Sequence, residues 1–250
     1  MIDKLIKNKV TISFIFSLLF VYILLFEFIL PINKVLPKPS ILIESVPSLF
    51  IEYNFLNALT LSISVIYLTL LISYFLIKLS KNILVVFSNN FPKSLELLKI
   101  SRYFMPLFLI LLFELWFQES IFGEILFILI LSMGSLKSAF LFELQNIKSE
   151  YLYSAKSLGL NENEIIDKVI WKSIQPKIFE SISQNHVYLW SWILVYEFIS
   201  KTDGIGALLY TALKYNDFSL ILVAIIFIVI TILIMNFVFL NIKKKFFFWE

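Results

Sequence analysis

The residues that could carry out covalent chemistry in this 250-residue chain are few. His186 is the single histidine, and Glu197 follows it in the same apolar run. If that run is a helix, their separation of 11 residues is three turns, which places them on one face but about 16 Å apart along the axis. The two side chains cannot form an acid–base pair within that helix, which argues against a membrane enzyme that uses both.

Other kinds of site are excluded by composition. The chain has no cysteine, so it can form no disulfide, thiolate metal site or cysteine nucleophile. A single histidine excludes a multi-histidine metal centre, and the five glycines do not have the spacing of a P-loop or a dinucleotide-binding motif. We therefore expect no metal or cofactor in this chain and no nucleic-acid partner, and any ATP that drives it must be bound by another chain.

The chain is too apolar for an ordinary soluble domain. Its residues are 60% hydrophobic and 16% charged, against about 45–50% and about 25% in typical soluble chains. The 27 Phe, 11 Tyr and 5 Trp suit lipid contact and the membrane interfaces. The composition indicates a protein that crosses a membrane several times.

The apolar runs predict an all-α polytopic membrane protein with about six transmembrane helices, forming one domain over residues 1–250. The third run is short and is interrupted by Pro106 and Glu114. Lysine and arginine gather in alternate connections, 16 on one side against 4 on the other, which predicts that both termini are cytoplasmic. We expect the first run to be an uncleaved helix. The runs are Val10–Leu30, Leu56–Ile77, Tyr103–Phe117, Ile121–Phe142, Ile178–Ile199 and Phe218–Leu240.

Two connections lie on the external side in this topology. The stretch from Pro31 to Phe55, with its sequence LPKPS, reads as an ordinary loop. In the second connection, Gly204 and Gly206 predict a tight turn, followed by a short apolar helix from Ala207 to Leu213. That helix either dips back towards the membrane or covers the external end, and the sequence does not separate these alternatives.

The cytoplasmic connection at about residues 145–177 has a helix–glycine–helix pattern. Leu152, Ala155 and Leu158 form one apolar edge of a short helix, which Gly159 would end in a left-handed conformation. Asn161 can cap a second helix, which we expect to stop before Pro176. About 30 structured residues are long for a simple link and suggest a surface that a partner holds.

These segments resemble the permease subunits of bacterial ABC importers, and most of all the nitrate/sulfonate/taurine/bicarbonate group. The cytoplasmic EAA motif of that family is occupied here by Tyr153, Ser154, Ala155, Lys156, Ser157, Leu158 and Gly159, and its ending by the residues Val169–Lys172. LPKPS, FELWF at Phe113–Phe117 and GIGALL at Gly204–Leu209 also match, so the resemblance covers about Leu36 to Trp249. Tyr153 replaces the family's glutamate, and Ser154 replaces its first alanine.

The resemblance implies partners and a place in the cell. Two ATPase subunits would dock on the coupling residues Tyr153, Ser154, Ala155, Lys156, Leu158 and Gly159. A second permease copy, in a homodimer, would complete the pathway, and a periplasmic or lipid-anchored binding protein would deliver substrate near Gly204–Tyr210. The location would be the bacterial inner membrane, with rigid-body movement of helices coupling ATP to transport.

Charged and polar residues within the runs are candidates for the pathway because intramembrane charges are costly. The candidate pathway residues are Glu114, His186, Tyr188, Trp192 and Glu197. For His186 a structural hydrogen bond is an equal alternative, and Glu27 and Glu197 stand close enough to the external ends to reach the lipid headgroups. Lys137 can snorkel to the cytoplasmic side.

The substrate and two alternative functions stay open at this point. The substrate is a small anion such as nitrate, a sulfonate or taurine, or a heterocycle like a thiamine precursor; the single pathway cation, Lys137, weakens the anion hypothesis. A secondary transporter is the first alternative, although we find no internal repeat of the kind such proteins carry. A membrane scaffold subunit without transport activity is the second.

Overall fold

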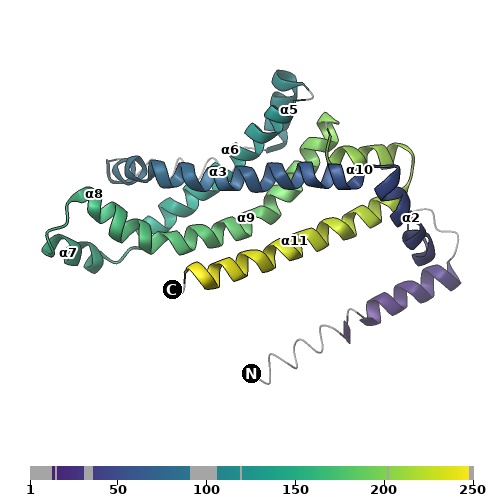
Figure 1. The fold of residues 1–250 in the computed structure, drawn as a ribbon, viewed down its shortest axis with the longest axis horizontal. Coiled ribbons are helices and arrows are strands. Elements are labelled where there is room, and N and C mark those ends of the chain that lie inside the picture. The colour runs from purple at the N-terminus through teal and green to yellow at the C-terminus, as the bar shows by residue number, and fades with distance from the viewer. Residues whose placement is uncertain are drawn as a thin grey trace. The chain divides into compact units, whose positions relative to one another are not determined.

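The computed structural model describes residues 13–14, 16–30, 36–90, 106–118, 120–201 and 203–247, and the regular elements in these ranges are helices without any strand (Figure 1). The predicted all-α class is confirmed. In chain order the elements are η1 (Leu24–Ile29), α2 (Pro39–Ile51), α3 (Phe55–Asn90), α5 (Pro106–Phe117), α6 (Ile121–Gln145), α7 (Ser149–Ser157), α8 (Glu162–Glu164), η3 (Ile165–Ile170), α9 (Trp171–Ser200), α10 (Ile205–Lys214) and α11 (Phe218–Phe246).

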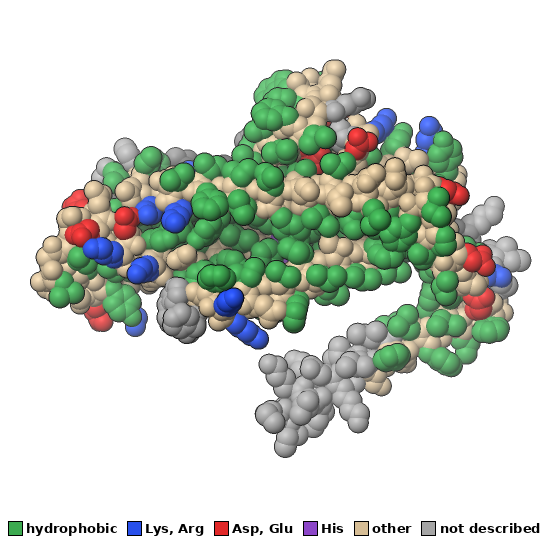
Figure 2. All heavy atoms as spheres, viewed as in Figure 1, with side chains coloured by type: hydrophobic (Ala, Val, Ile, Leu, Met, Phe, Trp, Pro, Cys, Tyr) green, Lys and Arg blue, Asp and Glu red, His purple; other side chains and the backbone are tan. Residues whose placement is uncertain are grey.

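Three of the described helices, α3, α6 and α11, are long and apolar enough to cross a membrane. Helix α9 has 30 residues and is therefore also long enough, about 45 Å, but it carries the polar stretch Gln184–His186. Hydrophobic side chains cover much of the visible surface of these helices, and charged side chains gather around α7 and α8 (Figure 2). This distribution is the one expected for a multi-pass membrane protein.

The chain divides into two compact units, Met1–Leu56 with Leu208–Val229, and Asn57–Ala207 with Ile230–Glu250. In the second unit α6 packs along α9, and α5 packs against both. Phe127 of α6 stacks on Tyr196 of α9 with ring centroids 5.2 Å apart. Ser73 of α3 and Ser132 of α6 are joined by a buried hydrogen bond. The core of this unit therefore combines aromatic packing with hydrogen bonds between helices.

In the first unit, α2 corrects the expectation of an ordinary loop between residues 31 and 55. Pro39 occupies the first turn of this 13-residue helix, where its fixed φ is favourable and its missing N–H costs nothing. Glu27 accepts hydrogen bonds from the Ser40 amide (3.3 Å) and hydroxyl (3.0 Å). From the sequence we expected Glu27 to reach the lipid headgroups; in the structure its carboxylate accepts hydrogen bonds from the first turn of α2.

Helix α9 also departs from the expectation, because the helical path does not stop before Pro176. It continues from η3 into α9 and passes through the proline to Ser200. Proline removes one backbone hydrogen bond from a helix interior. Here Trp171, Ile174 and Ile178 are at most 5% exposed, and this packing compensates for the lost bond.

Candidate functional site

The connection between α6 and α9 forms the predicted helix–glycine–helix element. Helix α7 ends at Ser157, and Gly159, two residues later, has a φ of +77°. The Leu160 amide donates to the Ala155 carbonyl at 3.2 Å, as in a Schellman ending. Asn161 Oδ1 accepts from the Glu164 amide at 2.9 Å, while the Glu164 carboxylate accepts from the Asn161 amide at 3.1 Å. The predicted left-handed glycine and the predicted cap are both confirmed, and they set the direction in which α8 leaves α7.

The residues of the EAA-like motif divide between the interior and the surface. Ala155 is 4% exposed, whereas Tyr153 is 70% and Leu158 is 79% exposed. Ser154 and Lys156 are also exposed. The expected apolar edge is therefore correct for Ala155 and wrong for Leu158, because Leu158 is the residue at which the chain leaves the helix and its side chain no longer follows the helical face.

The segment is attached to the membrane helices at its second end. Asp167 of η3 forms an ion pair of 2.7 Å with Lys81 of α3. Lys81 also lies 5.8 Å from the ring centroid of Trp171, which is 5% exposed and packs near Tyr74 and Phe140. The end of the segment thus contacts α3 through the Asp167–Lys81 ion pair, and Trp171 at the start of α9 packs near α3 and α6.

The charge pattern of this segment also supports its local structure. The Lys168 ammonium lies 2.8 Å from the Glu164 carboxylate. The hydrogen bond from Lys168, together with that from the Asn161 amide, holds the pKa of the Glu164 carboxyl group below its usual range. The ionised carboxylate is thus the form that closes the capping box.

Near the opposite end of α9, Glu197 is fully buried. It accepts hydrogen bonds from the Ser62 hydroxyl (2.5 Å) and the Gly206 amide (2.7 Å), and Ser62 Oγ accepts from the Ile205 amide (3.2 Å). The expectation that Glu197 reaches the headgroups is therefore wrong. The residues that follow α9 fold back over this carboxylate, and the Gly206 amide donates a hydrogen bond to it.

Glycine is required where α10 approaches Glu197. A Cβ on Gly204 would overlap the Glu197 carboxylate, and a Cβ on Gly206 would overlap the Leu194 carbonyl oxygen. Gly206 lies within α10 and not in the predicted turn, because the helix begins at Ile205. We name Ser62, Glu197 and the amides of Ile205 and Gly206 the α10 anchor.

Glu124 of α6, which is 2% exposed, stands beside the α10 anchor and hydrogen-bonds Glu197. Sequence reasoning missed Glu124, although a carboxylate near the start of an apolar run was a usable signal.

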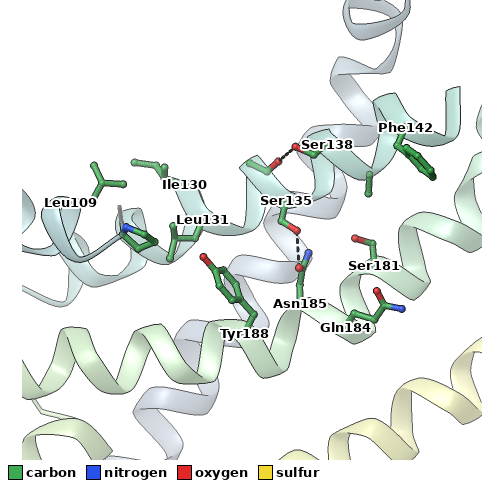
Figure 3. Close-up of a pocket in the computed structure, with 13 residues that line it drawn as sticks. Leu109, Ile130, Leu131, Ser135, Ser138, Phe142, Ser181, Gln184, Asn185 and Tyr188 are labelled. Atoms are coloured by element: carbon green, nitrogen blue, oxygen red, sulfur yellow. Dashed lines mark hydrogen bonds between the residues drawn. The ribbon is translucent and has the colours of Figure 1, made fainter. Parts of the chain in front are cut away.

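A cavity of about 960 Å³ lies between α5, α6 and α9 (Figure 3). Its polar lining residues are Ser135, Ser138, Ser181, Gln184, Asn185 and Tyr188. The Ser135 hydroxyl donates to Asn185 Oδ1 at 2.7 Å. Asn185 Nδ2 is buried and has no hydrogen-bond partner among the described residues. The cavity therefore holds a free donor next to several hydroxyl groups.

Of the five candidate pathway residues, Tyr188 lines this cavity. Trp192 lies next to it, with ring centroids 6.1 Å apart, but is not part of the lining. His186 is fully buried elsewhere, with Nδ1 2.6 Å from the Ser183 carbonyl oxygen and its ring 5.2 Å from that of Phe239. Glu114 on α5 and Glu197 also lie outside the lining.

From the sequence we did not identify the other polar residues of the lining as pathway candidates. Ser135 and Ser138 are three residues apart on α6, while Ser181, Asn185 and Tyr188 follow at three- and four-residue spacings on α9. These spacings place each group on one face of its helix. A polar stripe along an otherwise apolar helix is the signal that could have identified them.

The comparisons with known proteins agree with this architecture. The family model described as "binding-protein-dependent transport system inner membrane component" matches residues 9–246. The chain belongs to this family, whose members are the membrane permease components of ABC transporters and work with ATPase partners. No curated protein and no solved structure matches the chain. The family assignment argues against the alternative that the chain is a secondary transporter.

Proposed function

We propose that this chain is the permease subunit of an ABC importer and that residues 149–164 dock on a separate ATPase. The observation that carries the proposal is the rigid helix–glycine–helix element. It exposes Tyr153 and Leu158, while its other end is fixed to α3 by the Asp167–Lys81 ion pair. An element that is exposed at one end and anchored at the other is suited to pass a movement of the ATPase into the membrane helices.

The chemistry of this docking surface differs from that of the related permeases that it resembles. Tyr153 stands where their glutamate would contribute a charge-assisted contact. Here the exposed phenol ring and the Leu158 side chain offer apolar area instead, and such contacts depend little on salt concentration. A divergent ATPase groove of matching apolar character is the partner that this surface fits.

We also propose six spans with both termini in the cytoplasm. Helices α3, α6, α9 and α11 supply four of them, and the helical stretch Phe16–Ile29 supports the first. Helix α5 has 12 residues, about 18 Å, so it needs neighbouring residues to cross a hydrocarbon core of about 30 Å. The cations of the α7–α8 connection and of the end of α11 support a cytoplasmic position for both.

The remaining partners follow from this topology. A binding protein would meet the external side, near α10, and a second copy of the chain would complete the pathway in a homodimer. The bacterial inner membrane is the location that a binding-protein-dependent system implies.

A pair of substitutions at Gly159 tests the coupling proposal. Among the described residues, no atom beyond its chain neighbours lies within 4 Å of a Cβ built there, so the φ of +77° is the relevant constraint. We expect Gly159→Val to lower ATPase co-purification about 5–30-fold, because a β-branched residue costs roughly 1–2 kcal/mol in this conformation. Gly159→Asn, which tolerates the conformation, is the matched control and should retain the ATPase.

The measurement is a pull-down of the tagged chain from membranes in mild detergent, with the amount of inserted chain determined for each variant. Equal ATPase recovery with Gly159→Val and Gly159→Asn would contradict the assignment of the coupling segment. Recovery of no ATPase with the unaltered chain would favour the scaffold alternative.

A further inference from the structure

Every described residue that lines the cavity between α5, α6 and α9 is uncharged. Its polar groups are four kinds of neutral donor or acceptor: serine hydroxyls, a tyrosine hydroxyl, a glutamine amide and an asparagine amide. The other lining residues are apolar, proline, glycine or alanine. Lys137, the cation within α6, is not part of the lining even though it precedes Ser138.

The hydrogen bonds within the lining leave a defined set of groups for a ligand. Asn185 Oδ1 is occupied by Ser135, so the buried Nδ2 of Asn185 is available as a donor. The Ser138 hydroxyl donates to the Gly134 carbonyl at 2.8 Å, which leaves its oxygen as an acceptor. Figure 3 shows Asn185, Ser135 and Ser181 directed towards the same space. A ligand is thus offered a donor and acceptors within one cavity.

We propose that this cavity binds an uncharged hydrogen-bonding solute, and that the transported substrate occupies it without a net charge. The inference rests on the proposed permease function. Its volume of about 960 Å³ lies in the range of small-molecule sites. The free amide donor and the neighbouring hydroxyl acceptors match a molecule with both a carbonyl-like and an N–H or O–H group, such as an amide or a neutral heterocycle.

An ion would be disfavoured in the same place. Transferring a charge from water to a site without an opposite charge is costly, and neutral hydroxyl and amide groups compensate only part of that cost. A nitrate or sulfonate ion would be expected to require an arginine or lysine, which binds anions through charge-assisted hydrogen bonds. The lining residues that the structure describes supply neither arginine nor lysine, so the neutral solute is the occupant that they fit.

The absence of cysteine from the chain gives a direct test on the full-length protein. Ser138→Cys and Ser181→Cys place single thiols in the cavity. Each variant, in nanodiscs, is treated with three methanethiosulfonates of similar size: neutral hydroxyethyl, cationic trimethylammonium-ethyl and anionic sulfonatoethyl. The rates are divided by those of Ser154→Cys, which is exposed on α7, so that the intrinsic reactivity of each reagent cancels.

We expect the neutral reagent to modify both cavity thiols, with normalised rates about tenfold or more above those of either charged reagent. Leu71→Cys, on a 58% exposed position of α3, is the control for a thiol on the helix surface, and it should react with none of them. Normalised rates that do not differ between reagents, or a preference for the anionic one, would overturn the proposal. So would a failure of the neutral reagent at both cavity positions.

A second substitution tests whether the lining sets this preference. In the Ser138→Cys background, Gln184→Lys should raise the relative rate of the anionic reagent several-fold, while Gln184→Asn should leave it unchanged. Unchanged anionic rates with Gln184→Lys would contradict the assignment. Because the labelling requires neither ATPase nor binding protein, its outcome is independent of the Gly159 experiment.

Discussion

Glu197 stabilises the start of α10 from a neighbouring helix. The first backbone amides of a helix have no partner within it, and here the Gly206 amide donates to Glu197 while the Ile205 amide donates to Ser62. The Glu197 side chain therefore acts as an N-cap for α10, which is preceded by Gly204 and has no capping side chain of its own. Glu197 is buried so close to the start of α10 that glycine is needed both before the helix, at Gly204, and within its first turn, at Gly206.

At the residue scale, Glu197→Ala should release α10. Removing the acceptor leaves the Gly206 amide unsatisfied, at roughly 1–3 kcal/mol for a buried group, whereas the Ser62 hydroxyl keeps the Ala58 carbonyl as an acceptor at 3.2 Å. We expect hydrogen exchange of the Gly206 amide to become about 5–150-fold faster. Mass spectrometry of peptides that cover α10 measures this rate. Glu197→Gln, which keeps one oxygen acceptor, is the matched control, and equal exchange in the two variants would contradict the role of the α10 anchor.

At the scale of elements, the turn between α7 and α8 depends on one reciprocal cap. Asn161→Ala removes the side-chain acceptor for the Glu164 amide, a change that typically costs about 1 kcal/mol. We expect roughly fivefold faster exchange at the Glu164 amide. Asn163→Ala, at an exposed position of α8, should leave it unchanged, and a similar acceleration in both variants would exclude the cap as the cause.

The same cap should respond to acid. Hydrogen bonds from Lys168 and the Asn161 amide lower the pKa of the Glu164 carboxyl group from its ordinary value of 4.5. A carboxyl group with a lowered pKa stabilises the folded state above 4.5, and this contribution is lost as the pH falls through the folded-state pKa. Exchange of the Asn161 amide, corrected for its intrinsic rate, should therefore accelerate below pH 4.5, and constant protection there would contradict the role of Glu164.

Local sequence signals predicted the elements but not their contacts. The apolar runs located α3, α6 and α11. Gly159 and Asn161 located the turn because both act locally, Gly159 through its own φ and Asn161 through a hydrogen bond to the amide three residues on. The sequence did not reveal that Glu197 is buried against Ser62, since these residues are 135 positions apart. Pro176 was misread for a related reason: the packing that holds the helix together around it is tertiary.

At the scale of the whole molecule, the topology has a simple test. In intact cells, Asp203→Cys should react with a membrane-impermeant maleimide, because the proposed topology places it outside. Asn163→Cys should react only after the cells are permeabilised. The unaltered chain, which has no cysteine, is the blank. Labelling of Asn163→Cys in intact cells would reverse the orientation.

The uninterrupted course of α9 has a mechanical consequence. Its 30 residues measure about 45 Å, with Trp171, which directly follows η3, at one end and Glu197 of the α10 anchor near the other. Such a helix acts as a lever, and a tilt of about 5° around its middle would move each end by about 2 Å in opposite directions. In the proposed topology, a push on the cytoplasmic end of α9 would move the α10 anchor at its external end, without any relay of side chains between them.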